Sequence, residues 1–188
     1  EAIHVSSSPL KWVTHVFHFF INLPSQHKNE MPDHQSLQAF EMPQVQLGDD
    51  TGWIKVLLGR YGNFHANLPV HQQQFIYHLQ LAKGKVFTIG THAGWQYAAL
   101  VAFGNVIINE NKHERGELVV FDRSSNAIEL VAAFGNTDIL VFGGEPSGEP
   151  FVADGPVDMN PEHEITEAYN EYYEGKYGYI NKALLAKK

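Results

Sequence analysis

Short apolar segments, separated by turn residues, fill residues 53–144 and constrain the fold more than any other feature of the sequence. Each segment is rich in β-branched and aromatic residues, which favour strands. Many short strands at such close spacing predict an all-β sandwich or barrel. The segments are WIKVLLG (53–59), FIYHLQL (75–81), KVFTIG (85–90), YAALVAF (97–103), NVIIN (105–109), GELVVFD (116–122), AIELVAA (127–133) and DILVFGG (138–144).

One helix is predicted after the last of these strands. Asn160 is a good N-cap, Pro161 suits the first helical position, and Gly175 suits the C-terminal stop. Residues at spacings of three and four form one apolar stripe: Ile165, Ala168, Tyr169, Tyr172 and Tyr173. The stretch FGGEPSGEPFVADGPVDMNP (142–161) is therefore interpreted as a loop that leaves a strand and caps this helix.

Both ends of the chain are expected to differ from the strand-rich middle. The aromatic run WVTHVFHFFINL (12–23) predicts a buried strand, and residues 24–44 predict a polar connection with little regular structure. The apolar stretch at 179–188 suggests a short terminal helix.

Composition excludes several classes of function. A net charge of −8 argues against direct nucleic-acid binding, which usually needs a basic face. The absence of cysteine excludes disulfides and Cys-based zinc sites and is compatible with a cytoplasmic location. No apolar run is long enough for a transmembrane helix, and no signal peptide is recognised. Nucleophile-elbow, Walker and dinucleotide-binding motifs are also missing from the sequence.

Three stretches resemble the pirin family. They are the C-terminal run GGEPSGEPFVADGPVDMNPEHEITEAYNEYYEGKYG (143–178), the upstream run FFINLPSQHKNEMPDHQSLQAFEMPQV (19–45), and the strand pair GWQYAALVAFGNVIIN (94–109). Ala102 and Phe103 stand where the family commonly has Leu-Glu. The likeness runs in the right order over nearly the whole chain from about residue 4.

The resemblance implies a bicupin, in which two β-barrels pack together and the N-terminal one holds iron or another divalent metal. Members resemble metal-dependent quercetin 2,3-dioxygenases, and some are transcription cofactors. On this basis we expect a mostly β cupin (jelly-roll) barrel with a C-terminal α-helix. The expected parts are an N-terminal cupin remnant and linking strand (1–23), a polar connection (24–44), the C-terminal cupin barrel (45–159), and the C-terminal helix and tail (160–188).

The family's metal ligands, an H-x-H pair and an H-x-E pair, find almost no match among the eleven histidines. No H-x-H occurs, although period-2 spacing is what points two imidazoles into one barrel. The resemblance places His4 at one ligand position and Ser6 where the glutamate would stand. His4 is the one candidate metal ligand. The alternative is that His4 is an ordinary terminal histidine without a metal-binding role. We therefore predict no cofactor and no catalytic residue within this chain.

Aromatic residues in the strand region are expected to line the barrel interior or its mouth. They are Trp53, Phe75, Tyr77, Trp95 and Tyr97. An interior filled by side chains is favoured, and one small aromatic ligand is the alternative.

Two functional hypotheses stay open. In the first, the chain is the non-metal half of a pirin-like dioxygenase and is inactive alone. In the second, it is a non-catalytic cupin-fold module for binding or assembly, with a natural single-barrel dimer as one form. We expect the C-terminal helix to contact an N-terminal cupin or a second copy of the chain. We expect no membrane partner.

Overall fold

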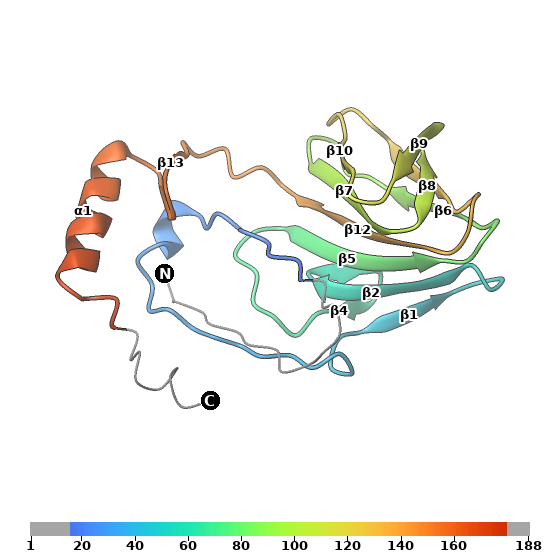
Figure 1. Cartoon of the computed structure of the whole chain (residues 1–188). Coiled ribbons are helices and arrows are strands. Elements are labelled where there is room, and N and C mark those ends of the chain that lie inside the picture. Colours follow the sequence, from blue (N-terminus) through green and yellow to red (C-terminus); the bar gives the residue numbers. More distant parts are fainter. Residues whose placement is uncertain (1–15, 180–188) are drawn as a thin grey trace. The chain divides into compact units, whose positions relative to one another are not determined.

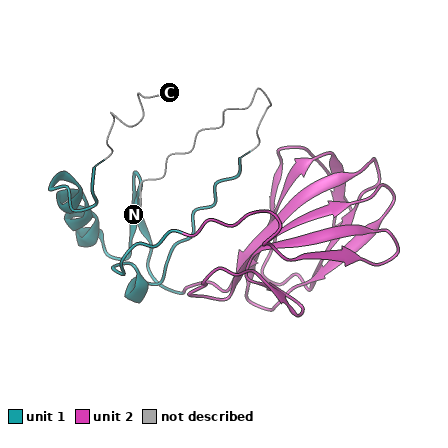
Figure 2. Ribbon diagram, turned by 90° about the horizontal axis from the view of Figure 1, so that it is seen from below, with its two compact units in different colours: residues 1–34, 148–188 teal, residues 35–147 magenta. Residues whose placement is uncertain are grey.

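The computed structural model describes residues 16–179, which belong to two compact units. One unit comprises residues 35–147, and the other combines the described residues of segments 1–34 and 148–188 (Figure 2).

Unit 35–147 consists of two antiparallel sheets and a small hairpin (Figure 1). The six-stranded sheet has the order β1 (Gln44–Leu47), β2 (Gly52–Leu58), β5 (Gln74–Leu81), β12 (Thr137–Gly144), β7 (Gln96–Phe103) and β10 (Leu118–Val120). The four-stranded sheet has the order β6 (Val86–Gly90), β11 (Ala127–Val131), β8 (Asn105–Ile108) and β9 (Asn111–Glu114). Strands β3 (Arg60–Tyr61) and β4 (Phe64–His65) form the hairpin.

The core of this unit is one apolar cluster to which both sheets contribute. Burial alternates along the strands, as expected where one face of a sheet is covered. The fully buried side chains include Ile54, Leu79, Leu81, Ile108, Ile128, Leu130, Ile139 and Val141. The predicted architecture, mostly β with one C-terminal helix, is confirmed.

Every segment predicted as a strand between residues 53 and 144 contains one. The prediction for residues 12–23 is wrong over its described part, because residues 16–23 form no regular structure. Val16 and Phe20 are 78% and 61% exposed. A strand needs hydrogen-bond partners for its backbone, and residues 16–23 pair with no strand in the described part of the chain.

The other unit contains the 3-10 helix η1 (Ser25–His27), the hairpin β13 (Val152–Asp154)–β14 (Val157–Met159), and helix α1 (Glu162–Tyr173). Helix α1 packs on this hairpin, and Ile165 and Ala168 are its buried residues. Tyr169 donates a hydrogen bond from its hydroxyl to Asp154 O (3.0 Å). No helix within residues 16–179 is long and apolar enough to cross a membrane.

The predicted helix is confirmed, but Asn160 is not its N-cap. The flanking residue is Pro161, and no side chain caps the first turn. Asn160 instead donates from Nδ2 to Glu149 Oε2 (2.9 Å) and to Pro150 O (3.0 Å). At the other end, Gly175 adopts a φ of +77° and its N–H bonds to Tyr172 O (3.0 Å), as expected of a C-terminal glycine. The terminal helix predicted at 179–188 lies almost entirely outside the described residues.

The carboxylate of Glu149 joins segments of this unit that are far apart in sequence. It accepts hydrogen bonds from Ser25 N (2.8 Å), Ser25 Oγ (3.1 Å) and Asn160 Nδ2. Nearby, Lys28 Nζ donates to Asp158 O (3.1 Å). The bond from the Ser25 backbone N–H is the largest cause that lowers the pKa of Glu149 below its ordinary value of 4.5.

We predict that Glu149→Gln lowers the melting temperature by a few degrees at neutral pH and flattens its decline in acid. A lowered pKa stabilises the fold above pH 4.5, and this stabilisation is lost as the pH falls through the folded-state value. Thermal unfolding from pH 3 to pH 7 measures both effects.

Glu145→Gln is the matched control, because it removes the same charge from the other Gly-Glu-Pro unit. The Glu145 side chain forms no hydrogen bond within residues 16–179. If both variants show the same acid dependence, Glu149 does not hold this unit together in the way described.

Candidate functional site

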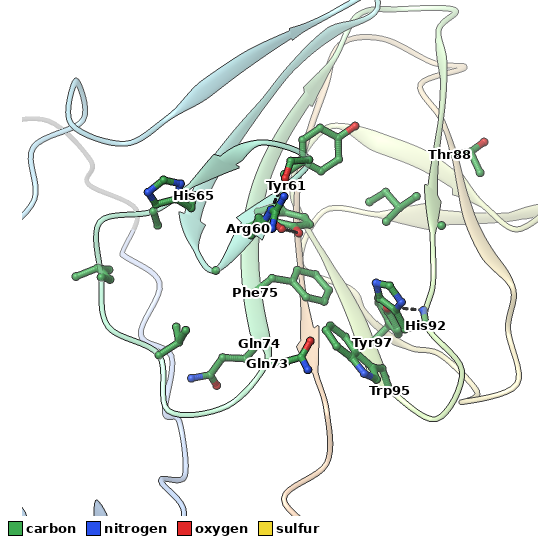
Figure 3. Close-up of a pocket in the computed structure, with 18 residues that line it drawn as sticks. Arg60, Tyr61, His65, Gln73, Gln74, Phe75, Thr88, His92, Trp95 and Tyr97 are labelled. Atoms are coloured by element: carbon green, nitrogen blue, oxygen red, sulfur yellow. Dashed lines mark hydrogen bonds between the residues drawn. The ribbon is translucent and has the colours of Figure 1, made fainter.

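A cavity of about 790 Å³ opens in unit 35–147 (Figure 3). Its walls come from hairpin β3–β4, from the loop and strand leading through β5, and from the end of β6 and the turn into β7. The cavity lies beside the apolar cluster whose side chains fill the region between the two sheets.

Aromatic rings form one wall of the cavity. Phe75 and Tyr97 are buried, and their ring centroids lie 5.4 Å apart. Trp95 lies 6.5 Å from Phe75 with an interplanar angle of 19°, and 6.4 Å from Tyr97 with an angle of 25°. Tyr77 stacks on Phe75 at 4.5 Å. The planes of Phe75 and Tyr97 are tilted by 44°, and the ring of Trp95 is close to parallel with each of them. The three rings thus form one apolar wall.

The end of strand β12 determines where this wall stands. Gly143 pairs with Phe75 on β5 and with Tyr97 on β7. Directly paired residues of an antiparallel sheet project to the same face, so the two rings flank a position that has no side chain. A Cβ on Gly143 would lie 2.0 Å from Gln96 O, and one on Gly144 would lie 2.5 Å from Gln73 O. The neighbouring backbones on both sides therefore come too close to β12 for any residue but glycine at these two positions.

Buried hydroxyl groups connect the aromatic wall to the loops around it. Tyr77 donates a hydrogen bond to Arg60 O, and burial raises the pKa of Tyr77 to about 12. Its phenol therefore stays neutral and remains a donor at physiological pH. The hydroxyl of Tyr97 accepts a hydrogen bond from His92 N (2.8 Å). Hairpin β3–β4 and the turn between β6 and β7 are thus each hydrogen-bonded to a ring that lines the cavity.

Phe75, Tyr77, Trp95 and Tyr97 all line the cavity, as the sequence predicts for the interior or its mouth. Trp53 does not. Its Nε1 donates to Gln80 Oε1 (2.9 Å), and its ring meets His78 edge-on at 4.9 Å.

Three histidines of this unit lie in or near the cavity region. His78 on β5 contacts Asp138 (3.0 Å between Nε2 and Oδ1) and does not line the cavity. His65 and His92 line the cavity, a role that the sequence did not reveal. Their positions depend on a short hairpin and a turn, which carry no motif.

The cavity does not fit a metal ion of the cupin type. Its lining provides two imidazoles and neither Asp nor Glu. Within residues 35–147, all of which are described, no three His, Asp or Glu side chains bring ligand atoms within 4.8 Å of one another. His4 and Ser6 lie outside the described residues, so the assignment of His4 as a ligand stays a prediction.

Comparison with known proteins identifies the family. Residues 57–178 match the family model described as the pirin C-terminal cupin domain, and the chain therefore belongs to the pirin family. Its fold is the cupin fold. A crystal structure of quercetin 2,3-dioxygenase from Acinetobacter baumannii superposes with a TM-score of 0.80 at 28% identity, covering 85% of this chain and 56% of that one.

Two curated relatives show the same partial coverage. The Pseudomonas aeruginosa protein named "Putative quercetin 2,3-dioxygenase PA2418" is 30% identical over 160 residues, which are 84% of this chain and 55% of the relative. Pirin-1 of Arabidopsis thaliana is 24% identical over 183 residues, 93% of this chain and 62% of the relative. The chain thus spans little more than half the length of these relatives.

We predict that Gly143→Ala destabilises the protein by about 1–3 kcal/mol or more, because the added methyl group meets a backbone carbonyl that cannot move freely. Urea unfolding measures the change. Gly48→Ala is the matched control: no atom lies within 4 Å of its Cβ, and its stability should stay within about 1 kcal/mol of wild type. Equal stability of the two variants would show that the strands do not need glycine at this position.

Proposed function

We propose that this chain is a non-catalytic cupin domain of a pirin-like protein, which binds a small planar aromatic molecule in its cavity. The observation that carries the proposal is the aromatic wall of Phe75, Trp95 and Tyr97 beside an open volume of about 790 Å³. Ligand pockets commonly measure about 300–1,000 Å³ and combine apolar walls with few polar groups. Offset stacking favours flat aromatic ligands over aliphatic ones of the same size.

The proposal includes inactivity of residues 1–188 as an oxygenase. The cavity lining provides no carboxylate, and His4 with Ser6 is a poor basis for tight metal binding. Where relatives are named dioxygenases, we propose that the activity needs iron or another divalent metal in an N-terminal cupin. Within residues 35–147, the chain's own contribution is to bind and orient a ring.

A second candidate function is assembly through helix α1. Tyr172 and Tyr173 continue the apolar stripe of the helix but are 55% and 78% exposed. Such side chains suit contact with an N-terminal cupin or with a second copy of the chain. A cytoplasmic location, and the absence of nucleic-acid and membrane partners, remain part of the proposal.

We predict that quercetin binds the metal-free protein under anaerobic conditions and that Trp95→Ala weakens binding about tenfold. Loss of one stacking ring together with its contact area corresponds to about 1.4 kcal/mol, which is a factor of ten in Kd. Isothermal titration calorimetry measures the affinity. Trp53→Ala is the control, because Trp53 lies outside the cavity lining, and a correctly folded variant should bind like wild type.

The same protein, supplied with Fe(II), Ni(II) or Mn(II) in air, should consume quercetin no faster than the metal alone. Equal weakening by both tryptophan variants, or no binding, would contradict the binding proposal. Turnover well above the metal-only rate would contradict the proposed inactivity.

A further inference from the structure

We propose that the cavity selects aromatic anions, such as aromatic carboxylates and phenolates, and that Arg60 pairs with their negative charge. This inference rests on the proposed function, because it specifies the class of aromatic molecule that the cavity binds.

The charge of the cavity is opposite to that of the protein. The chain carries 21 acidic and 13 basic residues, with a net charge of −8. The cavity lining nevertheless contains Arg60, His65 and His92 and neither Asp nor Glu. A cationic ligand would find no ionic partner there, whereas an anion would find an arginine. The local charge of the lining therefore favours a ligand with negative charge over a cationic one.

The guanidinium of Arg60 retains hydrogen-bonding capacity for a ligand. Its Nε donates to Gly62 O, which leaves the donors on the two terminal nitrogens. Among the described residues, no carboxylate lies within ion-pair distance of it. A guanidinium recognises a carboxylate through two parallel hydrogen bonds, which makes arginine the usual residue for this task.

The hairpin places a second nitrogen-containing side chain, that of His65, beside Arg60. His65 on β4 pairs directly with Arg60 on β3, so both side chains leave the hairpin on the same face. Both residues line the cavity (Figure 3). The imidazole of His65 adds a further group that can donate a hydrogen bond to an oxyanion.

Tyr77 connects this polar group to the aromatic wall. Its ring stacks on Phe75 at 4.5 Å, and its hydroxyl donates to the backbone oxygen of Arg60. The arginine backbone is therefore fixed relative to the rings. A ligand that stacks on the wall and carries a negative group at its edge satisfies both parts of the cavity at once.

The test compares 2-naphthoate with 2-naphthamide, which share one ring system and differ in charge. Calorimetry at pH 7.5 with the metal-free wild-type protein should show naphthoate binding about tenfold more tightly or better. Arg60→Gln should remove this preference and retain naphthamide binding. Arg123→Gln is the matched control, because it makes the same charge change outside the cavity lining and should leave the preference intact.

The outcomes separate the two proposals. If naphthamide binds as tightly as naphthoate, the anion inference is wrong and the aromatic-binding proposal stands. If neither compound binds, the proposed function fails, and the inference fails with it. The ratio of the naphthoate and naphthamide affinities of the wild-type protein tests the preference for anions even if Arg60→Gln does not fold. An equal loss of this preference in both arginine variants would exclude a specific role for Arg60.

Discussion

The close approach of strands β5 and β7 to the glycine end of β12 is the constraint on which the cavity depends. Gly143 pairs with Phe75 on one side and with Tyr97 on the other, and neither Gly143 nor Gly144 has room for a Cβ. Because a glycine separates them, the two rings approach to 5.4 Å across three strands. The juxtaposition of these two rings in the aromatic wall is thus a consequence of backbone packing at one strand end.

The repeated Gly-Glu-Pro sequence serves two separate structural purposes. Gly144 belongs to the first copy and, with Gly143, seats strand β12 between its neighbours. Glu149 belongs to the second copy, which lies in the other unit, and it binds Ser25 and Asn160 of that same unit. A motif that looks like a pair of equivalent acidic turns therefore combines a steric requirement with an electrostatic one. Neither Glu145 nor Glu149 lines the cavity.

The strands, the helix and the family could be predicted from sequence, because they follow from local patterns. Runs of β-branched and aromatic residues between turn residues located the strands of both sheets, and the apolar stripe and Gly175 marked α1. Two errors have one physical origin. Residues 16–23 have strand-forming side chains but no partner strand in the described part of the chain, and Asn160 has a capping side chain that bonds instead to Glu149. Both outcomes depend on segments far away in sequence, and so does the placement of His65 and His92 at the cavity.

The central claim is that the aromatic wall is a ligand site whose polar end is Arg60. A crystal structure with bound 6-bromo-2-naphthoate tests it most directly, because anomalous scattering locates the bromine without ambiguity. Our account places the ring against Phe75 and Trp95, with the carboxylate within hydrogen-bond distance of Arg60. Bromine found only at other surfaces, or a ring bound with its carboxylate directed away from Arg60, would contradict it.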